Sequence, residues 1–230
     1  MAKAGKPSRV AQEGDGRSSA TKRVLVEAAI ESLKTQGFSG ASARAIATRA
    51  GCNQALVFYH FGSVVNLLLA ALDAVSADRL AHYSAALGGV SSPAELVEVA
   101  SAIFREDLDA GYATVLVEMI AGASSTPGLG AEVAARIAPW TDFARSAIEV
   151  ALGQSALRAM IPSVEVAHGV VAFYLGLELL THLDGDRAAS LALFERTRQL
   201  VTVLGALGTQ FPTTSPTTSA TATPQEEHTP

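Results

Sequence analysis

Apolar residues recur at helical spacing through about 190 residues, and almost no segment shows the alternation of a strand. Ala and Leu dominate this region, and Gly or Pro interrupts it at intervals that suit helices of about 8 to 25 residues. The sequence therefore predicts an all-α fold with about nine helices. With 49% hydrophobic residues among 230, the chain can bury a sizeable core, which excludes a wholly disordered chain and a disulfide-stapled miniprotein.

Start and stop signals set the expected helix boundaries. Ser42 and Asn53 are capping residues, Gly37 is a left-handed stop, and Ser92 followed by proline and an acidic residue is a strong helix start. Pro139 is expected to kink or split the helix that contains it. The predicted helices cover residues 21–36, 43–50, 54–61, 63–87, 93–109, 112–123, 130–152, 164–183 and 187–208.

The two ends of the chain differ from its middle. Residues 1–19 are polar and aperiodic, which predicts a flexible basic arm, and residues 212–230 contain four Pro, seven Thr and two Ser, which predicts a disordered tail. A single cysteine, Cys52, allows no internal disulfide and no zinc spacing. The apolar run 164–183 carries four Glu or His residues, and no secretory signal is evident, so we expect a cytoplasmic protein that does not span a membrane.

Charge is distributed unevenly along the chain. The first 63 residues hold nine Lys or Arg against four Asp or Glu, whereas the remaining 167 hold eight against eighteen. This asymmetry indicates that the front of the chain meets a polyanion while the rest has another task. A solvated basic tail would explain Lys3, Lys6 and Arg9 equally well.

The segment 42–61 has the pattern of a helix-turn-helix, with two short helices separated by a turn at residues 51–53. In this motif the second helix enters the major groove of DNA. Many helical bundles contain such a hairpin, so the chemistry of its outward face matters. Gln54 can pair with adenine, while Leu56 and Phe58 can contact thymine methyl groups. Tyr59 and His60 offer polar tips for phosphates, and Arg44 adds a positive charge near a helix N-terminus; this set is typical of a DNA-binding face.

At these residues the chain resembles the TetR family of transcriptional regulators, over roughly residues 20–80. The resemblance rests on these motifs: Leu25-x-x-Ala28-Ala29, Gly37-Phe38, Ser42-x-x-x-Ile46-Ala47-x-x-Ala50-Gly51 and Tyr59-His60-Phe61-x-x-x-x-x-Leu67. It implies a homodimer that binds a palindromic operator through its N-terminal domains and an inducer through its C-terminal domains. The DNA-binding residues that it implies, with the capping Asn53 counted among them, are Ser42, Arg44, Asn53, Gln54, Ala55, Leu56, Phe58, Tyr59 and His60.

Two positions depart from the family's usual pattern. Val64 stands where a lysine usually opens the fourth helix, and Ala45 replaces an acidic residue. Losing the lysine removes one phosphate contact, which predicts weaker DNA binding unless a basic residue of the arm compensates.

The C-terminal region predicts a ligand pocket and a dimer interface. Aromatic and polar residues interspersed in the middle helices suit an apolar cavity with a few polar groups, although each would also fit an ordinary core. The candidate pocket residues are Phe104, Tyr112, Glu118, Met119, Trp140, Phe143, His168, Phe173 and Tyr174. Apolar stripes on the last two helices fit half of a four-helix dimer interface or an internal core, and their candidate residues are Val166, Val170, Leu177, Leu191, Phe194, Val201 and Leu204. Glu178 and His182 are spaced to pair or to lie in solvent.

The sequence thus favours a dimeric regulator with four parts, namely an arm at 1–19, a DNA-binding domain at 20–80, an effector and dimerisation domain at 81–211 and a tail at 212–230. Its expected partners are a double-stranded operator and a small hydrophobic or aromatic effector, and no metal or cofactor is expected. The alternative is an all-α ligand-binding or scaffold protein whose hairpin no longer binds DNA. A helical enzyme is less favoured, because none of the common catalytic or phosphate-binding motifs is present.

Overall fold

The computed structural model describes residues 9–153, 158 and 161–209, and within these ranges the chain forms nine α-helices and no strand. The predicted all-α class is confirmed. The helices are α1 (Arg9–Gly40), α2 (Ala43–Arg49), α3 (Ala55–Phe61), α4 (Val64–Ala86), α5 (Pro93–Ala110), α6 (Tyr112–Ala123), α7 (Leu129–Leu152), α8 (Ser163–Asp184) and α9 (Arg187–Thr209), with a short 3-10 turn η1 (Leu87–Gly89) after α4.

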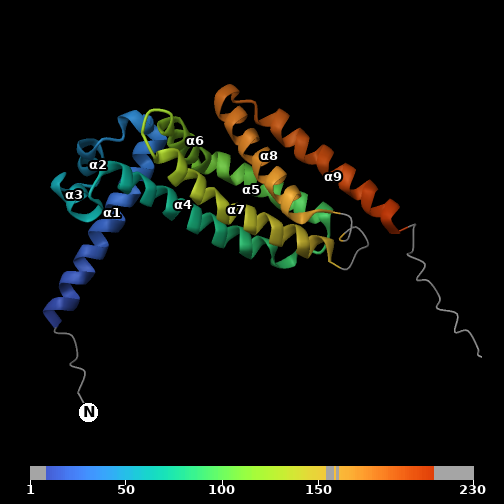
Figure 1. The fold of residues 1–230 in the computed structure, drawn as a ribbon, viewed down its shortest axis with the longest axis horizontal. Helices are drawn as coiled ribbons and strands as arrows, with labels where there is room; N and C mark the ends of the chain where they lie inside the picture. The colour runs from blue at the N-terminus through green and yellow to red at the C-terminus, as the bar shows by residue number, and fades with distance from the viewer. Residues whose placement is uncertain (1–8, 154–157, 159–160, 210–230) are drawn as a thin grey trace, which may run out of the picture.

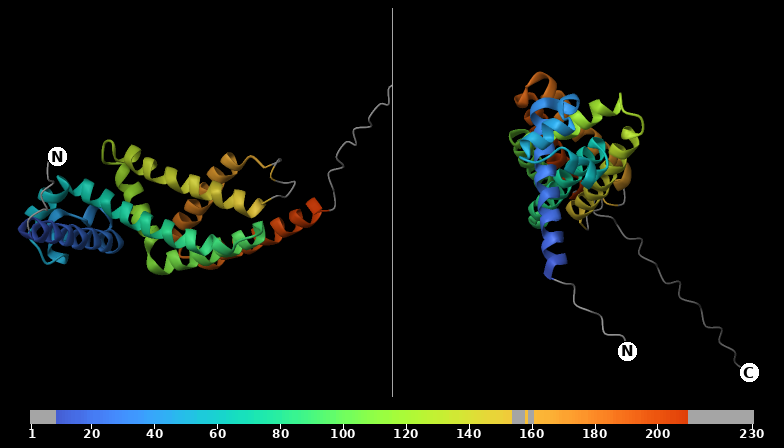
Figure 2. Two further views of the ribbon diagram at one scale, coloured as in Figure 1. Left: turned by 90° about the horizontal axis from the view of Figure 1, so that it is seen from below. Right: turned by 90° about the vertical axis from the view of Figure 1, so that its left-hand side faces the viewer.

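The helices form an elongated molecule with α1, α2 and α3 at one end (Figure 1). The long helix α4 leads from this end into a bundle in which α5 packs along α9 and α7 packs along α8. Helix α1 packs against both α4 and α6, so the small N-terminal domain rests directly on the bundle. Seen from below, α9 extends beyond the other helices at the far end (Figure 2).

Local capping explains several helix starts. The Ser42 hydroxyl accepts a hydrogen bond from the backbone N–H of Ala45 at 3.2 Å, and Ser63 accepts one from Asn66 at 3.0 Å. Ser92 accepts one from Glu95 at 3.3 Å, with proline at the first position of α5. Each bond satisfies one of the N–H groups that a helix start leaves without a partner, so these predicted boundaries follow from sequence alone.

Helix α1 is longer than predicted at both ends. It begins at Arg9 rather than near residue 21, so the prediction of a flexible arm through residue 19 is wrong for residues 9–19. A helix that is already nucleated extends through polar residues at little cost per residue, and this segment contains no proline. The predicted stop at Gly37 is present as a break with φ 70° and ψ 179°, followed by a last turn to Gly40. The predicted tail, 212–230, lies outside the described residues.

Helix α7 is not split at Pro139, because one continuous helix runs from Leu129 to Leu152. The other predicted boundaries agree with the structure to within a few residues, and α6 agrees at both ends.

The largest hydrophobic core is shared by the N-terminal domain and the bundle. It joins Leu25 and Leu33 of α1 and Ile46 of α2 with Val115 and Met119 of α6. A second cluster brings together Phe104, Leu177 and Phe194 from α5, α8 and α9, and a third lies between α7 and α8. The first core crosses the domain boundary, so α1 and α6 are in direct packing contact.

By length and apolar composition, α8 could cross a membrane, as could α3 and α4 taken together as one bent pair. Most of the apolar window of α8 is exposed on the single chain. Exposed apolar residues on a helix also suit a subunit interface.

Candidate DNA-binding surface and ligand cavity

Helices α2 and α3 form the predicted helix-turn-helix. Ile46, Ala47 and Val57 are buried and hold the two helices against the N-terminal core. The turn passes through Gly51 in a left-handed conformation with φ 64°, and the Asn53 side chain accepts a hydrogen bond from the Ala55 N–H at 2.9 Å. The predicted cap at Asn53 therefore exists, and it fixes where α3 begins.

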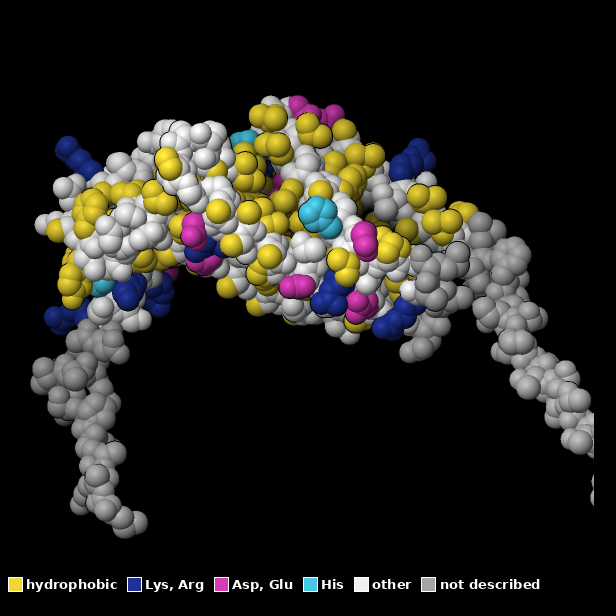
Figure 3. All heavy atoms as spheres, viewed as in Figure 1, with side chains coloured by type: hydrophobic (Ala, Val, Ile, Leu, Met, Phe, Trp, Pro, Cys, Tyr) yellow, Lys and Arg dark blue, Asp and Glu magenta, His cyan; other side chains and the backbone are white. Residues whose placement is uncertain are grey.

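The residues predicted to bind DNA lie mainly on the exposed face of this hairpin. Tyr59 is 79% exposed and Phe58 is 50% exposed, so neither ring serves the core. Leu56 and His60 are half-buried, and Leu56 packs against the core. The other predicted residues, all exposed, are Ser42, Arg44, Asn53, Gln54 and Ala55. Lys and Arg side chains gather at this end of the molecule (Figure 3).

Two neighbouring residues have structural roles instead. Arg49 donates a hydrogen bond to the Thr35 hydroxyl at 3.0 Å, which ties α2 to α1. Val64, at the first position of α4, is half-buried and packs against the N-terminal core. A valine at this position thus contributes packing in place of a positive charge.

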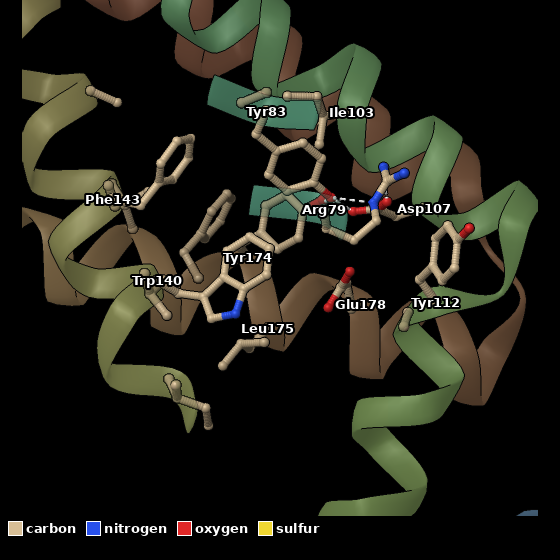
Figure 4. Close-up of a pocket in the computed structure, with 18 of the residues that line it drawn as sticks. Arg79, Tyr83, Ile103, Asp107, Tyr112, Trp140, Phe143, Tyr174, Leu175 and Glu178 are labelled. Atoms are coloured by element: carbon tan, nitrogen blue, oxygen red, sulfur yellow. Dashed lines mark hydrogen bonds and ion pairs between the residues drawn. The ribbon is translucent and has the colours of Figure 1, made fainter. Parts of the chain in front are cut away.

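A cavity of about 280 Å³ lies in the bundle, lined by residues of every helix from α4 to α9. Its walls are almost entirely apolar and aromatic (Figure 4). The rings of Tyr83, Trp140 and Phe143 meet one another at centroid distances of 5.5 to 6.4 Å. Such an arrangement is typical of a small-molecule site between helices.

A buried polar network lies at one end of this cavity. Arg79 of α4 and Asp107 of α5 form an ion pair, and both residues are at most 8% exposed. Tyr83 donates a hydrogen bond to the Asp107 carboxylate, and Tyr174 donates another at 2.9 Å. The guanidinium lies over the rings of Tyr83 and Tyr112, 4.8 Å from each centroid. These contacts offset the cost of burying both charges.

Glu178 of α8 also lines the cavity and lies on the same side as Arg79 and Asp107, away from Trp140 and Phe143 (Figure 4). It is 6% exposed, and no hydrogen bond or ion pair reaches its carboxyl group among the described residues. Burial, with a further contribution from the negative charge of Asp107, raises the pKa of Glu178 to about 8. Burial also raises the pKa of Asp107 and of Tyr174. Among the described residues, Glu178 thus presents to the cavity a carboxyl group that no hydrogen bond or ion pair reaches.

The structure brings five of the nine predicted pocket residues to the cavity, namely Tyr112, Trp140, Phe143, Phe173 and Tyr174. Phe104 and Met119 are fully buried in hydrophobic cores, and His168 is exposed. Glu118 accepts a hydrogen bond from the Phe38 N–H at 2.8 Å, at the junction of α1 and α6. None of these four lines the cavity, because Phe104, Met119 and Glu118 make contacts elsewhere in the protein and His168 faces solvent.

Sequence reasoning missed the polar end of the cavity. Arg79 and Asp107 are 28 positions apart, and no local pattern indicates that they pair. The sequence predicts that Glu178 either pairs with His182 or lies in solvent, but His182 is exposed and Glu178 is buried. Only the apolar residues on both sides of Glu178 in the sequence signal its burial.

The predicted dimer residues on α8 and α9 divide into two groups. Val166, Val170 and Leu204 are 37% to 48% exposed, and Val201 is half-buried. The assignments of Leu177 and Phe194 to an interface are wrong, because both are 5% exposed and pack within the chain against Phe104. Leu191 packs against the same cluster.

Further exposed apolar residues lie on these two helices, namely Val164, Phe173, Leu179, Leu180 and Leu183 of α8 and Leu193, Leu200 and Val203 of α9. Hydrophobic side chains accordingly gather over α8 in the space-filling view (Figure 3). So many exposed apolar side chains on two helices are typical of a protein interface.

Residues 25–71 match the family model of the bacterial regulatory proteins of the tetR family. Similar solved structures include a putative TetR-family transcriptional regulator from Rhodococcus sp., with a TM-score of 0.67 and 19% identity, which covers 79% of this chain and 98% of that one. A TetR-family regulator from Cytophaga hutchinsonii has a TM-score of 0.67 and 16% identity over 81% of this chain and 96% of that one. No curated protein matches the sequence.

A third similar structure is the transcriptional regulator FadR from Bacillus subtilis in complex with stearoyl-CoA, with a TM-score of 0.62 and 13% identity over 78% of this chain and 96% of that one. The chain therefore has the DNA-binding domain and the fold of a TetR-family transcriptional regulator. The resemblance inferred from the sequence is confirmed.

Proposed function

We propose that the protein is a cytoplasmic, homodimeric repressor that binds a palindromic operator and is released from it by a small hydrophobic or aromatic effector. The single observation that carries this proposal is the shared core, which links an exposed helix-turn-helix to a bundle with an apolar cavity. In this proposal the protein regulates transcription and catalyses no reaction, as the family match supports.

The exposed face of α3 supplies the proposed base contacts. Gln54, Ala55 and Phe58 point away from the core and can reach base edges, with half-buried Leu56 beside them. Other proposed contacts lie outside the base edges, mainly on the DNA backbone, and set the register of the protein on the duplex. They come from Ser42, Arg44, Asn53 and Tyr59, which are exposed, and from His60, which is half-buried.

A second copy of the chain is the proposed occupant of the exposed apolar face on α8 and α9. A two-fold dimer formed through these helices contains two recognition helices, one for each half-site of a palindrome. The number of exposed apolar residues on both helices supports a partner that covers them.

The effector is proposed to act through α4 and α6. Both helices line the cavity, and both pack directly on α1. In this proposal α4 and α6 have two arrangements, one that binds the operator and one that does not. An effector that binds the second arrangement more tightly changes the spacing of the two recognition helices. A coupling free energy of about 1–3 kcal/mol would then act reciprocally on ligand and DNA affinity.

The test is selection of bound sequences from random duplex DNA by the purified protein. An Arg44→Ala, Tyr59→Ala double variant provides the matched control, because both side chains are exposed and their loss leaves the core intact. We expect the wild type alone to enrich a palindrome. If neither protein enriches a sequence at low salt, the proposal of DNA binding is wrong. The chain is then a ligand-binding protein whose helix-turn-helix does not bind DNA.

A further inference from the structure

Glu178 is the feature of the cavity that the proposed function does not explain. Its carboxyl group is 6% exposed, lines the cavity and has no hydrogen-bond or ion-pair partner among the described residues. A buried carboxylate without a partner is costly, and buried polar groups in native proteins are nearly always paired. A bound ligand is therefore the natural source of the missing partner.

Neighbouring side chains do not supply that partner. Arg79 is the only buried cation in the described lining, and it is already paired with Asp107. Asp107 in turn accepts hydrogen bonds from Tyr83 and Tyr174, which hold it in place. The other cation of the described lining, Arg136, is paired with Asp73 and Glu132 outside the cavity, so an ionised Glu178 is the one lining carboxylate that no cation pairs with.

The aromatic rings of the cavity suit a positively charged ligand. The indole N–H of Trp140 donates to the Ser76 hydroxyl at 2.9 Å, so its polar edge is satisfied and its ring remains for the ligand. Rings in this cavity already lie over one cation, since Tyr83 and Tyr112 flank the Arg79 guanidinium at 4.8 Å. Aromatic ring faces attract cations, and a quaternary ammonium group is recognised most strongly in this way.

We propose that the effector is a compact hydrophobic molecule with one positive charge, such as a hydrophobic amine or a quaternary ammonium compound. Glu178 is its counter-ion, and the side of the cavity with Trp140 surrounds its apolar part. This inference rests on the proposed function, because it names the ligand class of the same cavity. Above pH 8, where Glu178 is mostly ionised, an anionic ligand would meet an unpaired carboxylate, and it would also compete with Asp107 for Arg79. A volume of about 280 Å³ restricts the ligand to a small one.

Proton release should accompany binding. The pKa of Glu178 is raised to about 8, so its carboxyl group is mostly protonated in the empty cavity at neutral pH. A bound cation favours the ionised form of Glu178, so binding expels the proton. The affinity for the cation then rises by up to about tenfold per pH unit below pH 8.

The titratable and charged groups around Glu178 come from five helices. They are Arg79 and Tyr83 of α4, Asp107 of α5, Tyr112 of α6, Arg136 of α7 and Tyr174 of α8, and the α9 lining residues Phe194 and Thr197 carry no charge.

The experiment compares three probes that share a phenyl group: benzyltrimethylammonium, its neutral isostere 2,2-dimethylpropylbenzene, and the anion 4-phenylbutyrate. Trp140 is the only tryptophan in the sequence, so its fluorescence reports binding in the cavity. At pH 8.5 we expect the ammonium probe to bind at least tenfold more tightly than either other probe. Its affinity should fall by up to tenfold for each unit as the pH is lowered from 8 to 6.

Glu178→Gln keeps the shape of the side chain and removes its charge. It should weaken binding of the ammonium probe at least tenfold, abolish the pH dependence, and leave binding of the neutral isostere unchanged. Glu165→Gln, an exposed carboxylate on the same helix, is the matched control and should bind like the wild type.

Several outcomes overturn the inference: no saturable binding of the ammonium probe by the wild type, equal or tighter binding of the neutral or anionic probe, or full binding by Glu178→Gln. The wild-type titrations decide the question even if that variant fails to fold. No DNA is present in these titrations, so their failure is distinct from a failure to select an operator.

Discussion

Glu118 and Glu178 show how two carboxylates in similar apolar sequence surroundings come to differ in role. Glu118 accepts the Phe38 N–H at 2.8 Å and thereby joins α6 to the last turn of α1. Glu178 lines the cavity, and no residue in the described part of the chain forms a hydrogen bond or ion pair with it. The first is a structural contact between domains, and the second is available to a ligand.

Removal of the Glu118 carboxylate should destabilise the junction between the domains. Glu118→Ala leaves the Phe38 N–H without an acceptor in a partly buried site, so we expect a loss of about 1–3 kcal/mol in the free energy of unfolding. Urea denaturation measures it. Glu118→Gln retains an acceptor oxygen and should lose less, so equal losses in both variants would show that the hydrogen bond is not the cause.

Glu178 should make stability depend on pH. Its pKa is raised from 4.5 to about 8 in the folded state, so folding favours the protonated form. The resulting stability is fully present below pH 4.5 and is lost as the pH rises through 8. Glu178→Gln stays neutral and should therefore be more stable than the wild type by roughly 2–4 kcal/mol at pH 8.5, with a difference that shrinks toward pH 4.5.

Chemical denaturation at a series of pH values between 4.5 and 9 measures this difference. Comparison with the variant separates Glu178 from Asp107, because burial, and not Glu178, raises the pKa of Asp107. Glu165→Gln should follow the wild-type curve. A constant difference across the whole range would contradict a titrating Glu178.

The sequence predicts the DNA-facing residues better than the cavity residues, for a physical reason. The DNA-facing residues lie on a short segment in which Ser42, Asn53 and Gly51 fix where each helix and the turn begin. These boundaries determine which side chains face outward. Cavity residues depend on which face of each long helix turns inward, and this is decided by packing between distant segments. Trp140 meets the cavity whereas His168 faces outward, although both sit among apolar neighbours.

At the scale of the elements, the contact between α1 and α6 depends on a close approach at Gly122. A Cβ atom at this position would lie 2.4 Å from the ring of Phe38. The two helices pack along much of their lengths, so this approach fixes how the DNA-binding domain sits on the bundle.

Gly122→Ala should therefore lower stability, even though alanine favours helix. Overpacking against the Phe38 ring should cost about 1–3 kcal/mol and outweigh the gain in helix propensity of about 1 kcal/mol. Thermal unfolding measures the balance. Gly16→Ala in α1 is the control, because nothing lies within 4 Å of its added Cβ, and it should be neutral or stabilising. A stabilised Gly122→Ala protein would contradict the close packing.

Boundaries of the helices were predictable where their signals are local. Ser92 and Pro93 start α5, and Gly111, with φ 68°, ends it one residue before α6 begins. The start of α1 was not predictable in this way. Its first turns lack a strong cap or an apolar stripe, so helix propagation from the ordered part decides where it begins.

At the scale of the whole molecule, basic residues and exposed apolar residues are concentrated on different parts of the surface. These parts are the proposed contacts with DNA and with a second subunit. Basic residues are concentrated at the end with α1 to α3, and exposed apolar residues are concentrated on α8 and α9 (Figure 3). DNA and a second subunit would then use separate surfaces, so both can bind at once. The cavity lies between them and can influence either contact.

Dimer formation through α8 and α9 should be sensitive to a single charge. Leu180 is 56% exposed on α8, and a two-fold interface would bury two copies of any charge placed there. We expect Leu180→Glu to convert the dimer to a monomer at micromolar concentration, as measured by sedimentation velocity. The monomer should lose at least tenfold in affinity for a palindrome, because it binds one half-site alone.

Val24→Glu is the matched control for this substitution. Val24 is an apolar residue that is 39% exposed on α1, and α1 packs mainly against α2, α4 and α6 rather than against α8 or α9. The control should sediment like the wild type. A monomeric wild type would contradict the proposed dimer outright, whereas a Leu180→Glu protein that remains dimeric would move the interface to another face. In the second case the exposed apolar residues of α8 would need a different partner, and the spacing of the recognition helices would have to be set by contacts outside this patch.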